Sequence, residues 1–260
     1  MTFATLAVTS DRDVLSITLN APATLNAVST RMADEIVEAL NTRGDARAVL
    51  LTGAGRAFCS GANLQHTPDA SVDSGAACEI AMERHFNPMI AAIADLPVPV
   101  VVAVNGAAAG IGCSLALAGD IVVAARSAYF LQAFVSVGLV PDGGASWLLP
   151  RIVGRARASA MLMLGEKVGA QQAEDWGLIH RCVPEQDLAA AAFEFARRLA
   201  GGPTVALGLI RRNIHIGSHQ TLADSLACEA RAQRVAVSSQ DAAEGVRAFV
   251  EKRPPVFVGR

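Results

Sequence analysis

Residues 99–130 read PVVVAVNGAAAGIGCSLALAGDIVVAARSAYF and contain two apolar runs separated by a glycine-rich stretch. The segments VVVAVNG at 100–106 and DIVVAAR at 120–126 each contain five consecutive apolar residues, which is typical of strands buried on both faces of a sheet. Residues 110–119 suit a helix that is opened by glycines. A buried strand, a helix and a second buried strand in succession predict an α/β fold.

The alternation of strands and helices extends toward the N-terminus. VLSITL at 14–19 alternates like a strand, and residues 47–52 read as a second strand. Between them, Ser29 can cap a helix that runs to about Asn41. A helical pattern returns from Ala76 to Ala94. These segments support the α/β prediction.

Beyond about residue 145 the strand pattern fades and the chain reads as helices. The expected helices lie at 154–165, 170–176, 186–201, 203–216 and 221–250. We therefore expect a core over residues 1–200 and a C-terminal helical region over 201–260. A long helical appendage on an α/β core often mediates assembly, and ordinary packing within one chain is the alternative.

Composition and charge argue against several classes of protein. The chain has 260 residues, enough to bury a sizeable core, and 52% of them are apolar. A net charge of −2 without a basic cluster argues against nucleic acid as a partner. Prolines and glycines interrupt the apolar residues near 96–118, so no membrane span of ~18 residues is expected. The absence of a signal peptide and five scattered cysteines indicate a cytoplasmic protein.

Two glycine-bearing junctions follow apolar strands, GAGRAFCSGANL at 53–64 and NGAAAGIGCSL at 105–115. The second junction opens a helix, and the first N–H groups of a helix lack partners and attract an anion. Two such sites facing each other could hold one developing negative oxygen. Taken singly, each junction is better explained as a tight turn that needs glycine for steric reasons.

Other familiar site patterns are weak. The glycines at 106, 110 and 112 do not form G-x-G-x-x-G, and no G-K-[ST] follows them. His215 and His219 lie four residues apart, but HIGSH lacks the Glu of H-E-x-x-H, which favours a surface pair over a metal site. We therefore expect no metal.

GLVPDGG at 138–144 contains Asp142, the only acid between Ala128 and Pro150. Pro-Asp-Gly-Gly is good turn chemistry, because Pro fixes φ, Asp bonds its own backbone and Gly accepts positive φ. On its own, the segment favours a turn over a catalytic carboxylate.

Together, GRAFCSGANL, the stretch 99–130 and GLVPDGG resemble the crotonase (enoyl-CoA hydratase/isomerase) superfamily over Val14–Gly259. LLTGAGRAFCSGANL, GLVPDGGASWLLPRIVGRARA and AEDWGLI look closest to the branch of ring-1,2-epoxyphenylacetyl-CoA isomerases and 3,2-enoyl-CoA isomerases. The resemblance implies a crotonase-like spiral of ββα turns, followed by helices that build a homotrimer or a dimer of trimers. It also implies an acyl-CoA thioester substrate, with CoA as part of the substrate and no separate cofactor.

The resemblance places the paired oxyanion donors on the backbone N–H groups of Ala62 and Ile111. The two glutamates of the hydratases fall at Ser114 and Phe134, so this pair is absent. Asp142 occupies the position of the single acid of the isomerase branch. We therefore expect an isomerase that either shifts an enoyl-CoA double bond or converts an epoxyphenylacetyl-CoA to its oxepin form. Hydration needs both a base and an acid, so a hydratase is the alternative, and a catalytically silent CoA-binding protein is the second.

The surroundings of the candidate acid bear on its strength as a base. Phe130, Phe134 and Val137 are expected to supply apolar surroundings that raise the pKa of Asp142 toward neutrality. A water could still be held by Ser114 or Ser136, without comparable activation.

The resemblance also implies a CoA-binding region along the chain after the first strand and along the first junction, with a contribution from AFVEKR of a neighbouring subunit. The candidate substrate- or CoA-binding residues are Thr24, Leu25, Ala27, Ala62, Asn63, Leu64, Phe134, Phe249 and Lys252. For Lys252, an ordinary solvated lysine is an equal alternative. The segment Gln65–Ile80 is expected to line or cover the acyl pocket.

Overall fold

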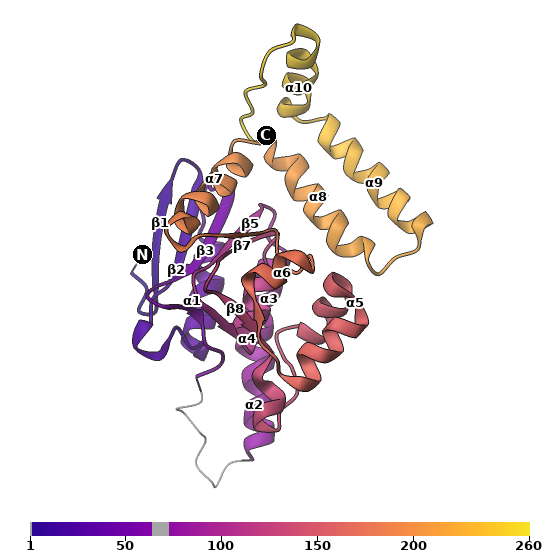
Figure 1. Ribbon diagram of the computed structural model, residues 1–260. Coiled ribbons are helices and arrows are strands. Elements are labelled where there is room, and N and C mark those ends of the chain that lie inside the picture. Colours follow the sequence, from indigo (N-terminus) through magenta and orange to yellow (C-terminus); the bar gives the residue numbers. More distant parts are fainter. Residues whose placement is uncertain (1, 64–72) are drawn as a thin grey trace.

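Two β-sheets organise this computed structural model, which describes residues 2–63 and 73–260 (Figure 1). The larger sheet has the order β1-β2-β3-β5-β7-β10 and the smaller sheet the order β4-β6-β8-β9. The larger sheet consists of β1 (Leu6–Asp11), β2 (Val14–Leu19), β3 (Ala48–Gly53), β5 (Val100–Val104), β7 (Ile121–Ala125) and β10 (Arg181–Val183). The smaller sheet consists of β4 (Ala57–Cys59), β6 (Ala107–Ala109), β8 (Tyr129–Leu131) and β9 (Val168–Gly169).

Successive strand pairs wind into a spiral. The pairs β3–β4, β5–β6 and β7–β8 each give one strand to the larger sheet and the next strand to the smaller one. Neighbouring turns of the spiral are parallel, and Leu51, Val102 and Val122 lie in one row across β3, β5 and β7. The helix α4 (Ile111–Leu117) follows the second pair. The predicted α/β class and ββα spiral are therefore confirmed.

The burial of the strand β5 explains the continuous apolar run that the sequence shows at Val100–Val104. All five of its residues are buried. The helix α7 (Leu188–Ala200) packs on one face of the larger sheet, while the strand β4 and the helix α4 contact β5 as well. A strand enclosed in this way has no position for a polar side chain, so alternation is absent.

The helices surround these sheets. Those not yet described are α1 (Thr30–Asn41), α2 (Ser74–Ala81), a π-helical turn (Met82–Phe86), α3 (Asn87–Ala94), α5 (Ala145–Leu164), α6 (Ala170–Asp175), α8 (Thr204–Gly217), α9 (Leu222–Val237) and α10 (Gln240–Glu251). Short 3-10 turns lie at Pro22–Thr24, Ala133–Val137 and Glu185–Asp187. Ser29 caps α1 as predicted, since its side chain accepts a hydrogen bond of 3.1 Å from the backbone N–H of Met32.

The C-terminal half differs from the prediction in three ways. Strands continue beyond residue 145 as β9 and β10. They were missed because they are too short to show a period in the sequence. The helix expected at 154–165 begins at Ala145 and is kinked at Gly154, whose φ of 77° and ψ of 162° are not helical. The helix expected at 221–250 is two helices, because Ser239 starts α10 by accepting from Ala242 N.

The N-terminal strand β1 was not predicted from the sequence. It lies at the edge of the larger sheet, and only its first residue, Leu6, is buried. A strand paired on one side and exposed along most of its length needs little apolar periodicity, so it leaves a weak pattern in the sequence.

The helices α8, α9 and α10 project away from the sheets, and α8 and α9 pack against each other (Figure 1). The core ends with α7 at Ala200. The division into a core and an oligomerisation region at residue 200 stays a prediction. Among residues 2–63 and 73–260, no helix combines the length and apolarity that crossing a membrane requires.

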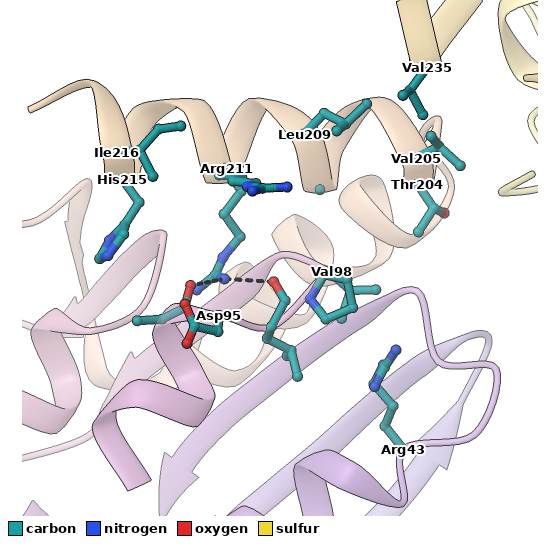
Figure 2. A pocket seen from close by; sticks show the side chains of 15 residues that line it. Arg43, Asp95, Val98, Thr204, Val205, Leu209, Arg211, His215, Ile216 and Val235 are labelled. Carbon is teal, nitrogen blue, oxygen red and sulfur yellow. Dashed lines mark hydrogen bonds between the residues drawn. The ribbon is translucent and has the colours of Figure 1, made fainter. Parts of the chain in front are cut away.

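A buried arginine anchors α8 to the core. Arg211 Nε donates to both carboxylate oxygens of Asp120, at 2.8 and 2.6 Å. Its Nη1 donates to the carbonyl oxygens of Ala94 and Leu96, at 2.6 and 2.7 Å. Figure 2 shows Arg211 reaching from α8 into a cavity of about 760 Å³ between α8 and the segment after α3. None of the candidate site residues lines this cavity.

Removing this anchor should destabilise the protein strongly. Arg211→Ala removes the donor of the carbonyl oxygens of Ala94 and Leu96 and leaves the Asp120 carboxylate with the backbone N–H of Val100 but without its cationic partner, so the free energy of unfolding should fall by about 3–5 kcal/mol. Urea denaturation at a fixed protein concentration measures this change. Arg247→Ala is the control, because Arg247 is exposed and lies 3.9 Å from Glu244. Equal urea midpoints for the two variants would contradict the prediction.

Candidate active site

In the first junction, the backbone N–H group of Ala62 is not used in the pairing with Val28. Val28 N donates to Gly61 O at 2.8 Å, and Asn63 N donates to Val28 O at 2.9 Å. These bonds form an isolated parallel bridge between Val28 and Ala62. In a parallel bridge the flanking residues supply the bonding groups, so the N–H of Ala62 points away from Val28.

The second junction opens α4 in a conformation that favours glycine. Gly110 has a φ of 52° and a ψ of −129°, and its N–H donates to Leu131 O at 2.9 Å. Its carbonyl oxygen accepts from Cys113 N and Ser114 N. Ile111 is the first residue of α4, so its N–H has no acceptor within the helix. Within the described residues, neither this N–H nor that of Ala62 has a hydrogen-bond partner.

The two junctions are in contact. A Cβ atom built on Gly110 would lie 3.7 Å from the Cα atom of Gly61. A Cβ atom on Gly112 would lie only 2.5 Å from Cys59 O, so α4 begins directly against the end of β4. Each of the two N–H groups belongs to the residue that follows one of the contacting glycines. The contact therefore brings together the parts of the chain that carry them.

Asp142 lies in a turn at the start of α5, against the same end of α4. Ala145 N donates to Asp142 O at 3.1 Å, and Gly143 has a φ of 58°. A Cβ atom on Gly143 would lie 3.2 Å from Ile111 Cγ1. The turn chemistry of Pro-Asp-Gly-Gly is thus present, and it places the lone acid beside the second junction.

The carboxyl group of Asp142 is unusual in its surroundings. Its Oδ1 atom is buried and has no hydrogen-bond partner among the described residues. Burial disfavours the charged form, and this desolvation raises the pKa of Asp142 to about 6. The direction agrees with the sequence-based expectation.

The apolar neighbours expected around Asp142 differ in their burial. Phe130 is fully buried, whereas Val137 is 61% exposed and so shields little in the chain alone. The ring of Phe134 lies against the second junction, with its Cζ atom 3.6 Å from a Cβ atom built on Gly110. Phe134 therefore lies beside the second junction, and its role in binding substrate stays a prediction.

The chain before α1 packs beside the first junction. Ser60 N donates to Leu25 O at 3.0 Å, and Ser60 Oγ donates to Thr24 O at 3.1 Å. The segment containing Thr24, Leu25 and Ala27 therefore adjoins Ala62 and Asn63. Leu64 and the first half of the expected pocket segment at 65–80 lie outside the described residues.

The C-terminal candidates lie elsewhere in the chain. Phe249 is 85% exposed on α10, and Lys252 is exposed just after that helix. Figure 1 shows α10 at the far end of the C-terminal helices from α4. Within one chain, the structure does not bring these two residues to Asp142.

The two histidines considered for a metal pack on an aromatic ring. The ring centroids of His215 and His219 lie 5.4 and 4.6 Å from that of Trp147. The described part of the chain contains no group of three His, Cys, Asp or Glu side chains placed to hold a metal ion.

One contact at the site could not be found in the sequence. Ser114 is fully buried, and its hydroxyl donates to Asp142 O at 2.9 Å. The two residues are 28 positions apart, and neither segment shows by its pattern that it meets the other.

Comparison with known proteins identifies the family of this chain. Residues 9–260 match the family described as enoyl-CoA hydratase/isomerase. A 1,2-epoxyphenylacetyl-CoA isomerase of Escherichia coli is 46% identical over 96% of this chain and 97% of its own length. A protein of Rhodobacter capsulatus named "Probable enoyl-CoA hydratase" is 44% identical, with both chains covered completely. The crystal structure of an enoyl-CoA hydratase from Polaromonas sp. JS666 superimposes with a TM-score of 0.91 at 37% identity, covering 97% of this chain and 99% of that one.

The chain therefore belongs to the enoyl-CoA hydratase/isomerase family and has the crotonase fold. It is an enzyme of that family, as the resemblance of its junctions predicted.

The raised pKa of Asp142 makes a prediction about stability. Below about pH 4 the carboxyl is protonated in both the folded and the unfolded state. As the pH rises through about 6, the unfolded chain is already ionised while the folded chain resists ionisation, so folding loses stability. Asp142→Asn should remove this loss. The free energy of unfolding of the variant, relative to that of wild type, should therefore rise by about 2 kcal/mol between pH 4 and pH 8.

Urea denaturation of both proteins across this pH range measures the difference between their free energies of unfolding. A difference that stays constant with pH would show that Asp142 is not desolvated in the folded protein.

Proposed function

We propose that the protein is a CoA-thioester isomerase in which Asp142 carries a proton from one carbon of the acyl group to another. The observation that carries the proposal is the buried Oδ1 atom of Asp142, which lies beside the start of α4 and has no hydrogen-bond partner among the described residues. A buried carboxylate without hydrogen bonds is a stronger base than an ordinary one. A pKa of about 6 still leaves it mostly ionised at neutral pH.

The two junctions supply the other half of the chemistry. The thioester oxygen would accept hydrogen bonds from the backbone N–H groups of Ala62 and Ile111. Asp142 would then remove a proton from one carbon, and the electrons of that C–H bond would move onto the thioester oxygen as an enolate. The two donors stabilise this negative charge, and losing one such donor typically costs ~10²–10³ in rate.

The reaction is completed by return of the same proton. The enolate electrons re-form the carbonyl as the proton passes from Asp142 to the second carbon, so the double bond moves and nothing is added. One carboxylate therefore suffices for both steps. CoA would enter as part of the substrate, and no separate cofactor is needed.

Two substrates fit this chemistry. In a 3-enoyl-CoA only the proton and the double bond move. In an epoxyphenylacetyl-CoA the bond between the two epoxide carbons would break as its electron pair joins the double bonds of the enlarged oxepin ring, and Asp142 would move a proton from the acyl α-carbon to a ring carbon. The relative of 46% identity is named 1,2-epoxyphenylacetyl-CoA isomerase, which supports the second. Among the described residues, the small Ser114 and the apolar Phe134 would leave Asp142 as the only carboxylate at the reacting carbons.

A hydratase is the second candidate, because a relative of 44% identity carries a hydratase name. Hydration requires one group to activate water and another to protonate carbon. The hydroxyl of Ser114 already donates its single proton to Asp142 O. Ser114 thus has no proton left to donate to carbon, and a neutral hydroxyl that accepts from water is a far weaker base than a carboxylate. This favours the isomerase over the hydratase, while a silent CoA-binding protein would show no turnover of either kind.

The C-terminal helices support a proposed homotrimer or dimer of trimers. They expose several large apolar side chains that one chain leaves uncovered, including those of Ile210, Ile214, Leu226, Phe249 and Val250. An exposed apolar face of this kind is typical of an interface. A neighbouring subunit could then bring Phe249 and Lys252 to the CoA.

Assembly has a direct test. Sedimentation equilibrium should give the mass of three or six chains, and Lys252→Ala should raise KM for acyl-CoA substrates several-fold with little change in kcat. A monomer with unchanged KM in the variant would contradict this part of the proposal.

The reaction itself is tested by incubating the protein in heavy water with a 3-enoyl-CoA, a 2-enoyl-CoA or an epoxyphenylacetyl-CoA. The masses of the products are then measured by mass spectrometry. We expect an isomer of the substrate, with no atoms added and at most exchanged deuterium, and a loss of ~10³-fold or more in kcat for Asp142→Asn. The profile of kcat/KM against pH should rise through about pH 6, where Asp142 ionises. A product heavier by one water, or full activity in the variant, would overturn the isomerase.

A further inference from the structure

The turn that carries Asp142 is tied to α4 by one side chain. Ser114 is fully buried in the second turn of α4, and its Oγ atom donates to the backbone carbonyl oxygen of Asp142 at 2.9 Å. This contact does not involve the carboxyl group of Asp142. It holds the main chain from which that carboxyl group projects.

The same two segments are also in van der Waals contact. A Cβ atom built on Gly143 would lie 2.7 Å from Ser114 Cβ and 3.1 Å from Ser114 Oγ. There is consequently no room for a larger side chain on the turn where it crosses Ser114. The turn is fixed by a hydrogen bond at Asp142 and by close packing at Gly143.

We propose that Ser114 is a positioning residue that aims the Asp142 carboxyl at the reacting carbon through its hydrogen bond to the main chain of Asp142. The inference rests on the proposed isomerase function and adds the residue that sets its geometry. Ser114 does not touch the substrate in this role, and its single proton is donated to Asp142 O rather than to a water. Its effect is on the orientation of the base.

The physical reason lies in the sensitivity of proton transfer to distance. The carboxyl oxygen has no hydrogen bond of its own among the described residues, so its place depends on the turn. Misplacement of a catalytic group by ~1 Å can cost ~10²-fold in rate. A turn released from α4 would also let water reach the carboxyl, which lowers its strength as a base.

Ser114→Ala tests the inference in the whole protein with a 3-enoyl-CoA or an epoxyphenylacetyl-CoA, whichever the wild type converts. We expect kcat to fall ~10–100-fold with KM within ~3-fold of wild type. The inflection of kcat/KM against pH should move below that of wild type. In the Asp142→Asn background, the further loss should vanish, since the residue being aimed is gone.

Thr52→Val is the matched control. Thr52 Oγ1 also donates to a main-chain carbonyl oxygen, that of Ala103, at 2.9 Å, but it lies in β3. This variant should lose a comparable amount of stability in urea and keep kcat. A kcat near wild type in Ser114→Ala with an unmoved inflection, or an equal kcat loss in Thr52→Val, overturns the inference.

Failure of the inference is distinct from failure of the proposed function. If Asp142→Asn is inactive and Ser114→Ala behaves like wild type, only the role of Ser114 is wrong. If Asp142→Asn is as active as wild type, the isomerase mechanism and the role of Ser114 are both wrong.

Discussion

The close approach of α4 to the end of β4 is the constraint on which the site depends. Gly112 has no space for a side chain, because a Cβ atom there would meet Cys59 O at 2.5 Å. This approach joins two successive turns of the spiral at the ends of their smaller-sheet strands. The N–H groups of Ala62 and Ile111, which have no hydrogen-bond partner among the described residues, lie next to it. A feature of strand and helix packing thus creates a place where negative charge can be stabilised.

The position of Asp142 is set by the next turn of the spiral. The chain leaves β8, forms a 3-10 turn and reaches Pro-Asp-Gly-Gly, which starts α5. The turn reading and the catalytic reading of Asp142 are therefore compatible, because the turn places the carboxyl group against α4. Burial without a hydrogen-bond partner then raises its pKa to about 6. The cost of desolvating this acid stays in the folded protein as reduced stability at neutral pH.

Local patterns predicted what depends on local chemistry. The apolar run of β5 and the cap at Ser29 were predicted because burial on both faces and helix capping leave direct traces in the sequence. The edge strand β1 and the short strands β9 and β10 were missed, since pairing with distant residues creates them and too few residues carry a pattern. The oxyanion donors and Asp142 came from family resemblance, because backbone N–H groups have no residue signature. The Ser114–Asp142 contact needed the folded chain, as it joins residues 28 positions apart.

The central claim is that two backbone donors and one desolvated carboxylate meet at a single acyl group. The most direct measurement is a crystal structure of Asp142→Asn with a bound acyl-CoA substrate, since the variant should bind without turnover. The account predicts that the thioester oxygen lies within about 3.2 Å of both Ala62 N and Ile111 N, with the side chain at position 142 facing the carbon that loses its proton. A thioester oxygen bound away from these two N–H groups, or a side chain at 142 that faces away from the acyl group, would contradict it.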